Sequence, residues 1–372
     1  MKSKRHHCTT KSIVLTALLS TSFGYLASLP AFGKKPECPV GVNVNSFQNF
    51  DPAQQETIVE QLKQSHVRFV RTSLRPDEKN MNLAKRLQDE GIGLVLVPGV
   101  ECREGARQRP ANDKFRMRAA MPLSATDVER SRKYYQTVFD KLDDKGVVLT
   151  AVELGNELNW ADFNGDFPVP GQGKAFNFAE LSSDPEAKQV AKGFLLYLKA
   201  LAALKEVRDH SKLNQNTPII TCGMASAAGG AWQKQWKIDG VTIPATYAFL
   251  RAHGLDNLVD GYGVHTYPRS VKAGDKADVE RRATELDETI FPANCDKPFW
   301  VTEWGFSSKA NSSEEDKDRT RSVEEIRNYF HHLYKQGRLG GIFWYVWNEP
   351  DRSSIYRNGT MMEAGHKATA SM

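Results

Sequence analysis

The chain has 372 residues, of which 40% are hydrophobic and 26% charged, and its 50 Lys and Arg against 45 Asp and Glu give a formal net charge of +5. Most of this excess belongs to residues 1–33, which contain four basic and no acidic residues, so the rest of the chain has a net charge of only +1. The composition is that of a globular protein, and its global charge does not call for a nucleic-acid partner.

Residues 1–33 have the layout of a signal peptide. A basic start, MKSKRHHCTTK, precedes the apolar stretch SIVLTALLSTSFGYLASL, and the small residues Ala31 and Gly33 have the spacing that a signal peptidase reads. We therefore expect cleavage after Gly33, one mature domain over residues 34–372, and a secreted or periplasmic protein. The alternative is an uncleaved leader that anchors the protein, because about 18 apolar residues just span a bilayer.

The cysteines give no sign of metal binding or redox catalysis. Cys8 belongs to the leader, and the even number that remains, Cys38, Cys102, Cys222 and Cys295, permits disulfides in an exported chain without fixing a pairing. None lies in a C-x-x-C pair. Cys222, within the apolar run PIITCG, is expected to be a free core residue, and neither a metal nor a cofactor is expected.

Short apolar runs rich in Val, Ile, Phe and Trp alternate with longer segments of helical spacing after the leader. The eight runs lie at 40–47, 67–74, 91–100, 146–157, 217–226, 259–268, 297–306 and 339–350. Eight βα units predict a (β/α)8 TIM barrel, an α/β fold in a single domain. An open doubly wound sheet would prefer a Gly-rich turn after the first strand, which NVNSFQNFDP lacks.

The loops that follow the third, fourth and fifth strands are expected to be long, whereas those leading into strands are short. Active sites of such barrels lie on the face built by the loops that follow the strands, so this asymmetry predicts the working face. Glu157 and Glu303, at the expected ends of the fourth and seventh strands, would share this rim across the barrel mouth.

Two facing carboxyl groups suit glycoside hydrolysis, in which one acts as acid and the other as nucleophile or base. Their separation is about 5–5.5 Å in retaining enzymes and roughly 6.5–9.5 Å in inverting ones. The alternative for either glutamate alone is a structural ion pair at the barrel rim. The surrounding motifs favour the catalytic interpretation.

Four motifs occur in a fixed order: GNE at the end of the fourth strand, HTY at the sixth, TEWG at the seventh, and a Trp-rich eighth strand. In this the sequence resembles the clan A glycoside hydrolases, retaining (β/α)8 enzymes that include families 5 and 39. The resemblance spans residues 40–350, although the third strand lacks a histidine found in many family 5 enzymes. It implies Glu157 as acid/base, Glu303 as nucleophile, and Asn156 as the partner of the sugar hydroxyl beside the anomeric carbon.

The same resemblance implies supporting roles for three further residues. Tyr267 would hold the nucleophile through its hydroxyl, His265 would line the same subsite, and Arg71 matches the arginine that these enzymes keep near the nucleophile. Without the resemblance, Arg71 would equally suit a barrel-end ion pair. An arginine cation and a tyrosine donor would both favour the ionised form of Glu303.

Tryptophans are candidate sugar-binding residues because aromatic rings stack on the C–H faces of pyranoses. We expect one of Trp344 and Trp347 to form the platform under the sugar, and the sequence does not decide which. Trp304 is also expected to line the cleft, as is Trp160 in the long loop 158–178, which could alternatively form a small satellite core.

Three other features have competing interpretations. Glu153 shares strand parity with Glu157 and is expected to be a buried structural carboxylate bonded to neighbours such as Arg or Tyr. Glu349 in WNEPD resembles an acid/base motif, but it lies too close to the end of the chain to precede a nucleophile strand. The basic segment 102–118 suits either an anionic polysaccharide or a solvated loop.

The sequence thus predicts a secreted retaining β-glycosidase that hydrolyses an oligo- or polysaccharide without a cofactor or metal. We expect a monomer. The alternatives are a transglycosylase with the same residues, a non-catalytic carbohydrate-binding barrel, and a matrix scaffold that binds no sugar.

Overall fold

The computed structural model describes residues 37–226, 231–267, 296–347 and 352–372. The predicted leader, Cys295 and Glu349 lie outside these ranges. From Glu37 onward the described residues belong to one compact unit. Within these ranges no helix combines the length and the apolar character needed to cross a bilayer.

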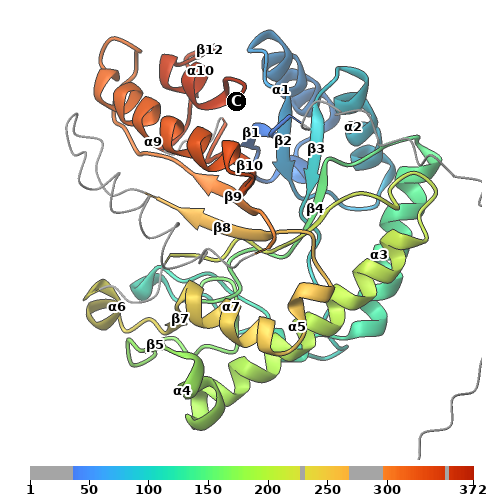
Figure 1. The fold of residues 1–372 in the computed structure, drawn as a ribbon, viewed down its shortest axis with the longest axis vertical. Helices are drawn as coiled ribbons and strands as arrows, with labels where there is room; N and C mark the ends of the chain where they lie inside the picture. Colours follow the sequence, from blue (N-terminus) through green and yellow to red (C-terminus); the bar gives the residue numbers. More distant parts are fainter. Residues whose placement is uncertain (1–36, 227–230, 268–295, 348–351) are drawn as a thin grey trace, which may run out of the picture. The chain divides into compact units, whose positions relative to one another are not determined.

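Eight parallel strands form the central sheet (Figure 1). They are β1 (Val40–Asn43), β2 (Phe69–Thr72), β3 (Gly93–Leu96), β4 (Ala151–Leu154), β6 (Ile219–Thr221), β8 (Tyr262–Thr266), β9 (Phe299–Trp304) and β10 (Leu339–Trp344). Their order in the sheet is β6-β4-β3-β2-β1-β10-β9-β8. Each strand falls inside one of the eight runs expected from the sequence.

Backbone contacts between the two outermost strands close this sheet into a barrel. Ile220 and Gly261 form a parallel bridge, and the N–H of Met224 donates to the carbonyl of Gly263 at 3.2 Å. The N–H of His265 donates in turn to the carbonyl of Met224 at 2.9 Å. The closure confirms the predicted (β/α)8 architecture and contradicts the alternative of an open doubly wound sheet.

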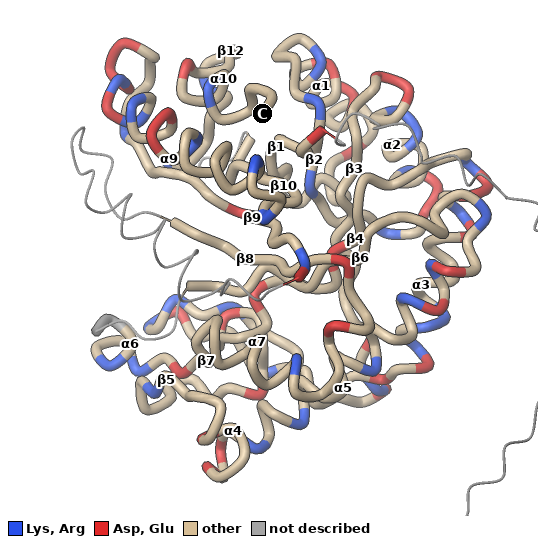
Figure 2. Tube along the Cα trace, in the orientation of Figure 1, with Lys and Arg blue, Asp and Glu red and all other residues tan. Residues whose placement is uncertain are grey.

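Helices surround the barrel and connect its strands (Figure 1). The longer ones are α1 (Pro52–Gln64), α2 (Glu78–Asp89), α3 (Val128–Asp144), α5 (Pro185–Asp209), α7 (Ile243–Ala252) and α9 (Lys317–Lys335). Aspartates cap the starts of α1, α2, α3 and α5 by accepting backbone N–H groups. Figure 2 shows acidic and basic residues mixed along α3 and α9, as expected for helices with one face in water.

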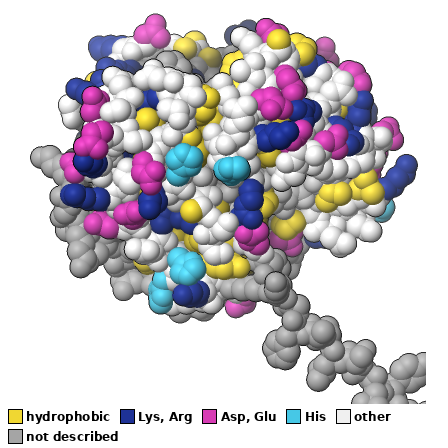
Figure 3. Space-filling model, turned by 90° about the horizontal axis from the view of Figure 1, so that it is seen from above, with side chains coloured by type: hydrophobic (Ala, Val, Ile, Leu, Met, Phe, Trp, Pro, Cys, Tyr) yellow, Lys and Arg dark blue, Asp and Glu magenta, His cyan; other side chains and the backbone are white. Residues whose placement is uncertain are grey.

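The remaining elements are short. They are α4 (Phe178–Ser183), α6 (Ala231–Trp236), α10 (Glu363–Thr369), β5 (Ala175–Phe176), β7 (Gly240–Val241), β11 (Tyr356–Arg357), β12 (Thr360–Met361), and the 3-10 turns η1 (Phe47–Asn49), η2 (Asp113–Phe115), η3 (Leu123–Ala125) and η4 (Leu255–Asn257). On the face shown in Figure 3, acidic and basic side chains are interspersed, so the described residues form no broad basic patch there.

An apolar cluster fills the barrel interior below the working face. Its buried members are Val95, Ala151, Ile220, Trp300 and Phe343, with Phe69 packed against them. Because inward positions recur every second residue, the next inward residues on β2 and β4 are Arg71 and Glu153. The interior therefore changes from apolar to charged toward the carboxyl ends of the strands.

The loop lengths agree with the predicted working face. Residues 97–127 separate β3 from α3 and residues 155–177 separate β4 from α4, whereas only residues 65–68 lead from α1 into β2 and residues 90–92 from α2 into β3. The long loops thus follow the strands and surround the charged end of the barrel, where such folds hold their active sites.

The described cysteines are free thiols, including Cys222, which is fully buried as expected from its apolar surroundings. Burial raises the pKa of Cys222 to about 12. Cys38 is also buried and Cys102 is half-buried. No disulfide joins these three residues, and a thiol with so high a pKa as that of Cys222 is a poor nucleophile.

Candidate active site

A cavity of about 620 Å³ opens at the carboxyl ends of the strands. Its volume lies in the usual range of small-molecule binding sites, and most of its lining is polar. The lining residues are Asn43, Val44, Asn45, Ser46, Gln48, Arg71, Thr72, Ser73, Val97, Arg118, Asn156, Glu157, Phe163, Tyr267, Glu303 and Tyr345.

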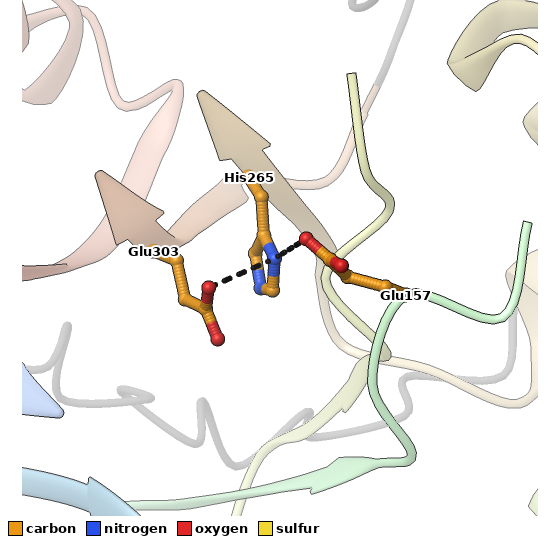
Figure 4. A group of neighbouring side chains, drawn as sticks. All are labelled: Glu157, His265 and Glu303. Atoms are coloured by element: carbon orange, nitrogen blue, oxygen red, sulfur yellow. Dashed lines mark hydrogen bonds and ion pairs between the residues drawn. The ribbon is translucent and has the colours of Figure 1, made fainter. Parts of the chain in front are cut away.

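Glu157 and Glu303 face one another across this cavity (Figure 4). One carboxylate oxygen of each, together with a ring nitrogen of His265, lie within 4.8 Å of one another. Glu303 is 7% exposed and Glu157 9%, so both carboxyl groups are largely removed from water. The separation is short enough for one sugar carbon to contact both groups.

Different local structures position the two glutamates. The fourth strand ends at Leu154, so Glu157 lies three residues beyond it rather than at its last position. Gly155 and Glu157 both have a positive φ, 83° and 47°, and the N–H of Glu157 donates to the carbonyl of Gly223 at 3.0 Å. This turn directs the Glu157 side chain from the strand end into the cavity, and such left-handed backbone is common at functional sites.

Glu303 lies inside β9, beside an irregularity in the strand. Val264 pairs with Val301, but the next pair is His265 with Glu303, so Thr302 is an extra residue in β9. Because of this bulge, the side chains of two successive residues, Thr302 and Glu303, both reach the barrel interior, where Thr302 donates to Glu153 and Glu303 lines the cavity. Bulges commonly re-aim side chains in this way.

Arg71 connects the groups at the base of the cavity. Its Nε and Nη2 bind the two carboxylate oxygens of Glu153 at 2.6 and 2.9 Å. Its Nη1 donates to Asn43 at 2.7 Å and to Glu303 at 2.8 Å, and its Nη2 also donates to Asn156 at 2.7 Å. All five N–H donors of the guanidinium therefore have protein acceptors.

Glu153 is a structural carboxylate, as its strand parity predicts. It is fully buried, and beyond Arg71 it accepts hydrogen bonds from the Gly223 N–H at 2.7 Å and the Thr302 hydroxyl at 3.1 Å. It does not line the cavity. The negative charge of Glu153 neutralises the positive charge of Arg71. Glu303 is a second carboxylate bonded to the same guanidinium.

The surroundings of Glu303 favour its ionised form. Burial alone would raise the pKa of Glu303, but His265, Arg71 and Tyr267 act in the opposite direction and lower it overall. The Tyr267 hydroxyl donates to Glu303 Oε2 at 2.6 Å. Burial raises the pKa of Tyr267 well above its ordinary value, so this hydroxyl stays protonated and keeps its role as donor.

Glu157 has different partners. Its Oε1 lies 2.8 Å from His265 Nδ1, and its Oε2 accepts a hydrogen bond from the Trp160 indole at 3.0 Å. His265 Nδ1 also lies 3.3 Å from Glu303 Oε2, so the fully buried ring lies between the two carboxyl groups. No described Lys or Arg forms an ion pair with Glu157, in contrast to Glu303.

The same triad of Glu157, His265 and Glu303 is the set of described residues whose ligand atoms converge closely enough to hold a metal ion. A metal-binding histidine normally donates its other ring N–H to an acceptor. His265 Nε2 is buried, and no described residue provides such an acceptor. The donor set therefore lacks the support typical of a dedicated metal site.

The structure brings together the motif residues but not the tryptophans. Trp304, Trp344 and Trp347 are fully buried, and none of them lines the cavity. The rings of Trp304 and Trp344 pack on each other with centroids 4.8 Å apart, and Trp304 also contacts Phe330 of α9. The expectation that one of Trp344 and Trp347 forms a sugar platform is therefore wrong, as is the expectation that Trp304 lines the cleft.

Strand parity gives the reason for this correction. Phe343 belongs to the interior cluster, so Trp344 points outward toward α9 and the next inward residue is Tyr345. Tyr345 lines the cavity and its hydroxyl accepts a hydrogen bond from Asn45 at 2.8 Å. Trp160 is half-buried and reaches the site only through its bond to Glu157, without lining the cavity.

Sequence reasoning missed the residues that β1 and β10 contribute to the site. Asn43 and Asn45 recur with period two in VGVNVN, a polar alternation at a strand end that is a recognisable signal for a polar cavity. Asn43 fixes its own side chain by donating to the carbonyls of Thr302 and Trp344, at 3.0 and 3.2 Å. For Tyr345, the sequence offers only its position two residues after Phe343, which places both side chains on the same side of the strand.

The comparisons with known proteins concern the fold and the class of enzyme. Residues 188–372 match the sequence model of a family described as glycosyl hydrolase catalytic core. No curated protein sequence shows significant similarity to the chain. The chain is thus similar to glycosyl hydrolases over its second half, and this match, with the barrel and its paired glutamates, supports a glycoside hydrolase.

Solved structures support the fold. One, from a study of two fungal β-1,4-galactanases, is 13% identical, covers 89% of this chain and 94% of its own, and has a TM-score of 0.51. Another, the family 1 β-glucosidase from Thermotoga maritima, is 11% identical, covers 90% and 97%, and has a TM-score of 0.52. At these identities the likeness shows the (β/α)8 fold alone.

The Arg71 network predicts that Glu153→Gln destabilises the fold. The substitution removes one charge of a fully buried ion pair and turns an amide N–H₂ toward the guanidinium, so we expect a loss of about 3–5 kcal/mol in the free energy of unfolding. Urea denaturation measures it. The matched control is Glu37→Gln, which breaks an exposed pair with Arg68 and should cost less than about 1 kcal/mol. Equal effects in the two variants would contradict a structural role for Glu153.

Proposed function

We propose that the protein is an exported retaining β-glycosidase that hydrolyses an oligo- or polysaccharide by double displacement. Glu303 is the nucleophile and Glu157 the acid/base. The observation that carries this proposal is the approach of the two carboxyl groups to within 4.8 Å across a polar cavity. This limit on the distance between their nearest oxygens favours the separation of about 5–5.5 Å typical of retention over the roughly 6.5–9.5 Å typical of inversion.

In the first step, a carboxylate oxygen of Glu303 attacks the anomeric carbon while Glu157 transfers its proton to the glycosidic oxygen. The bond from the anomeric carbon to that oxygen breaks, and the sugar is held as an ester of Glu303. In the second step, Glu157 takes a proton from a water molecule, whose oxygen attacks the anomeric carbon and releases Glu303 as a carboxylate. Glu157 regains its proton, so the cycle is complete.

The hydrogen bonds of the two glutamates support this division of roles. His265, Arg71 and Tyr267 lower the pKa of Glu303 and so favour the ionised form that a nucleophile needs. Glu157 contacts an imidazole and an indole rather than an arginine. Its place in the cycle, as the group that carries a proton at the start, needs no permanent cation beside it.

Asn156 is suited to bind the substrate beside the anomeric carbon. Its carbonyl oxygen accepts from Arg71, which fixes the orientation of the amide. No described residue accepts a hydrogen bond from its Nδ2, and the residue lines the cavity next to Glu157. The free N–H₂ group can therefore donate to a sugar hydroxyl, a contact that strengthens as charge develops on the ring.

Glu303→Gln and Glu157→Ala test the two roles as a pair. We expect Glu303→Gln to lower kcat by about 1,000-fold or more, because the amide cannot form the glycosyl ester. Glu157→Ala should lose most activity on glycans. With an aryl glycoside, whose good leaving group needs no acid, azide should restore turnover, since azide needs no general base and fits the vacated space. Product analysis by NMR should show a β-glycosyl azide. Full activity of Glu303→Gln, or an α-configured azide product, would contradict the proposed mechanism.

Tyr267→Phe tests the electrostatic support of the nucleophile. Loss of the hydroxyl removes one of the groups that lower the pKa of Glu303, so this pKa should rise. Because catalysis needs ionised Glu303, the acidic limb of the kcat/KM profile should move to higher pH, and kcat/KM at the optimum should fall by about 10-fold.

The matched control for Tyr267→Phe is Tyr356→Phe, whose hydroxyl bonds to the carbonyl of Gly359 outside the cavity. It should leave the profile unchanged. An unshifted acidic limb in Tyr267→Phe would argue against the assigned role of the hydroxyl.

The lowered pKa of Glu303 also affects the stability of the fold. The ionised carboxylate stabilises the folded protein above the pKa of an unfolded glutamate, and this contribution is lost as the pH falls through the lower pKa that Glu303 has in the folded protein.

Export rests on the leader pattern of residues 1–33, with its basic start, apolar stretch and small residues at 31 and 33. We expect the protein in the periplasm or the medium to begin at Lys34. N-terminal sequencing of the protein expressed in full length in a bacterium measures this. A chain that keeps residue 1 and fractionates with the membrane would instead support the uncleaved anchor.

A further inference from the structure

Two arginines line the cavity, and they differ in what they can offer a substrate. Arg71 is 4% exposed, and each of its five N–H donors is already bonded to a protein acceptor. The side chain of Arg118 is 66% exposed. No described residue accepts a hydrogen bond from either of its Nη groups, so it presents up to four unused donors to the cavity.

Two neighbours hold the Arg118 side chain in place. Asp162, whose side chain is only 8% exposed, lies 3.0 Å from Nε and also accepts the backbone N–H of Arg118 at 2.8 Å. The guanidinium carbon lies 4.6 Å from the centroid of the Phe163 ring, a cation–π contact. Asp162 thus occupies the Nε side of the guanidinium while Phe163 supports its face, which leaves the Nη edge available.

The backbone around Arg118 is also ordered by contacts within the basic segment. Arg109 and Ala120 exchange both of their backbone hydrogen bonds, at 2.9 and 3.0 Å, and Asn112 and Met117 form a second antiparallel bridge. The Arg109 guanidinium donates to the carbonyls of Arg118, at 3.1 Å, and Ala161. This ladder joins the segment to the loop that follows Glu157, so Arg118 is held at a defined place on the cavity wall.

We propose that Arg118 forms a subsite for an anionic substituent of the glycan, a carboxylate or a sulfate ester. A planar guanidinium with a free Nη edge matches the two oxygens of such a group. The inference rests on the proposed glycosidase function and specifies its substrate class. The two sources of negative charge, uronic acids and sulfated sugars, share this chemistry and are separated by the experiment.

The rest of the basic segment adds a long-range attraction. Arg107, Lys114 and Arg116 are exposed, and residues 102–118 contain six basic residues against two acidic ones. A local positive potential of this kind raises the encounter rate with polyanions and weakens with added salt. Asp162 reduces the net charge at Arg118, but it lies behind the exposed edge and does not line the cavity.

The experiment compares ligands that differ only in their charged group. The probes are glucuronic-acid-containing β-linked oligosaccharides with their carboxyl-reduced forms, and sulfated oligosaccharides with their desulfated forms. Binding is measured by calorimetry in Glu303→Gln, which cannot turn them over, and kcat/KM is measured in the wild type. We expect at least one anionic probe to bind about 10- to 100-fold more tightly than its neutral partner, which is the range of one or two charge-assisted hydrogen bonds.

Arg118→Gln, combined with Glu303→Gln for the binding measurement, should abolish this preference while affinity for the neutral partners changes by less than about threefold. The matched control is Arg107→Gln, an exposed arginine of the same segment that does not line the cavity. It should keep the preference. Arg118→Lys should retain part of it, because a lysine keeps the charge but loses the planar fork.

Each result has a defined meaning. Equal binding of charged and neutral partners, or a preference that survives Arg118→Gln, overturns the subsite. A larger loss for carboxylates than for sulfates assigns the site to uronic acids, and the reverse assigns it to sulfated sugars. Because binding is measured without turnover, an anionic preference that depends on Arg118 supports the subsite even if no probe is hydrolysed. The absence of hydrolysis would count against the proposed glycosidase function and not against the subsite.

Discussion

The buried guanidinium of Arg71 is the interaction on which the active site depends. An arginine enclosed by protein is costly unless every N–H group has an acceptor. Here Glu153 takes two of the five donors, and Asn43, Glu303 and Asn156 take the others. These partners come from β1, β9, and β4 with the turn that follows it, so one side chain fixes the relative positions of three strands. The apolar cluster beneath it excludes water, which strengthens each of these bonds and makes the loss of any one expensive.

The same cation produces the difference between the two glutamates of the cavity. Glu303 is bonded to Arg71 and Tyr267, and His265, Arg71 and Tyr267 together outweigh the effect of burial on its pKa. Glu157, whose carboxylate oxygen lies within 4.8 Å of one from Glu303, is bonded instead to His265 and Trp160. Two carboxyl groups that are close in space thus have unequal surroundings because only one of them touches the arginine. Paired acid and nucleophile chemistry requires such an inequality.

The barrel was predictable from the sequence because βα repetition and apolar runs recur eight times, and parity alone places Glu153 correctly in the interior. Periodicity also indicates that the ends of parallel strands share one rim, which brings Glu157 and Glu303 together. It fails where the backbone leaves its regular path: the extra residue Thr302 in β9 and the left-handed turn at Glu157 are local features with no periodic signal. The error at Trp344 has another origin. A tryptophan near a sugar site suggests a platform, whereas strand parity directs Trp344 outward against Trp304.

The two arginines of the cavity show how the site separates chemistry from recognition. Arg71 is on a barrel strand and uses all its donors to hold protein groups, so a change there alters the reacting carboxylates. Arg118 is on the loop after β3, and its free edge faces the cavity without touching either glutamate. Loops of (β/α)8 barrels vary without disturbing the strands. The charge preferred in a substrate can therefore change through residues 97–127, while Glu303 on β9 and Glu157 in the turn after β4 keep their places.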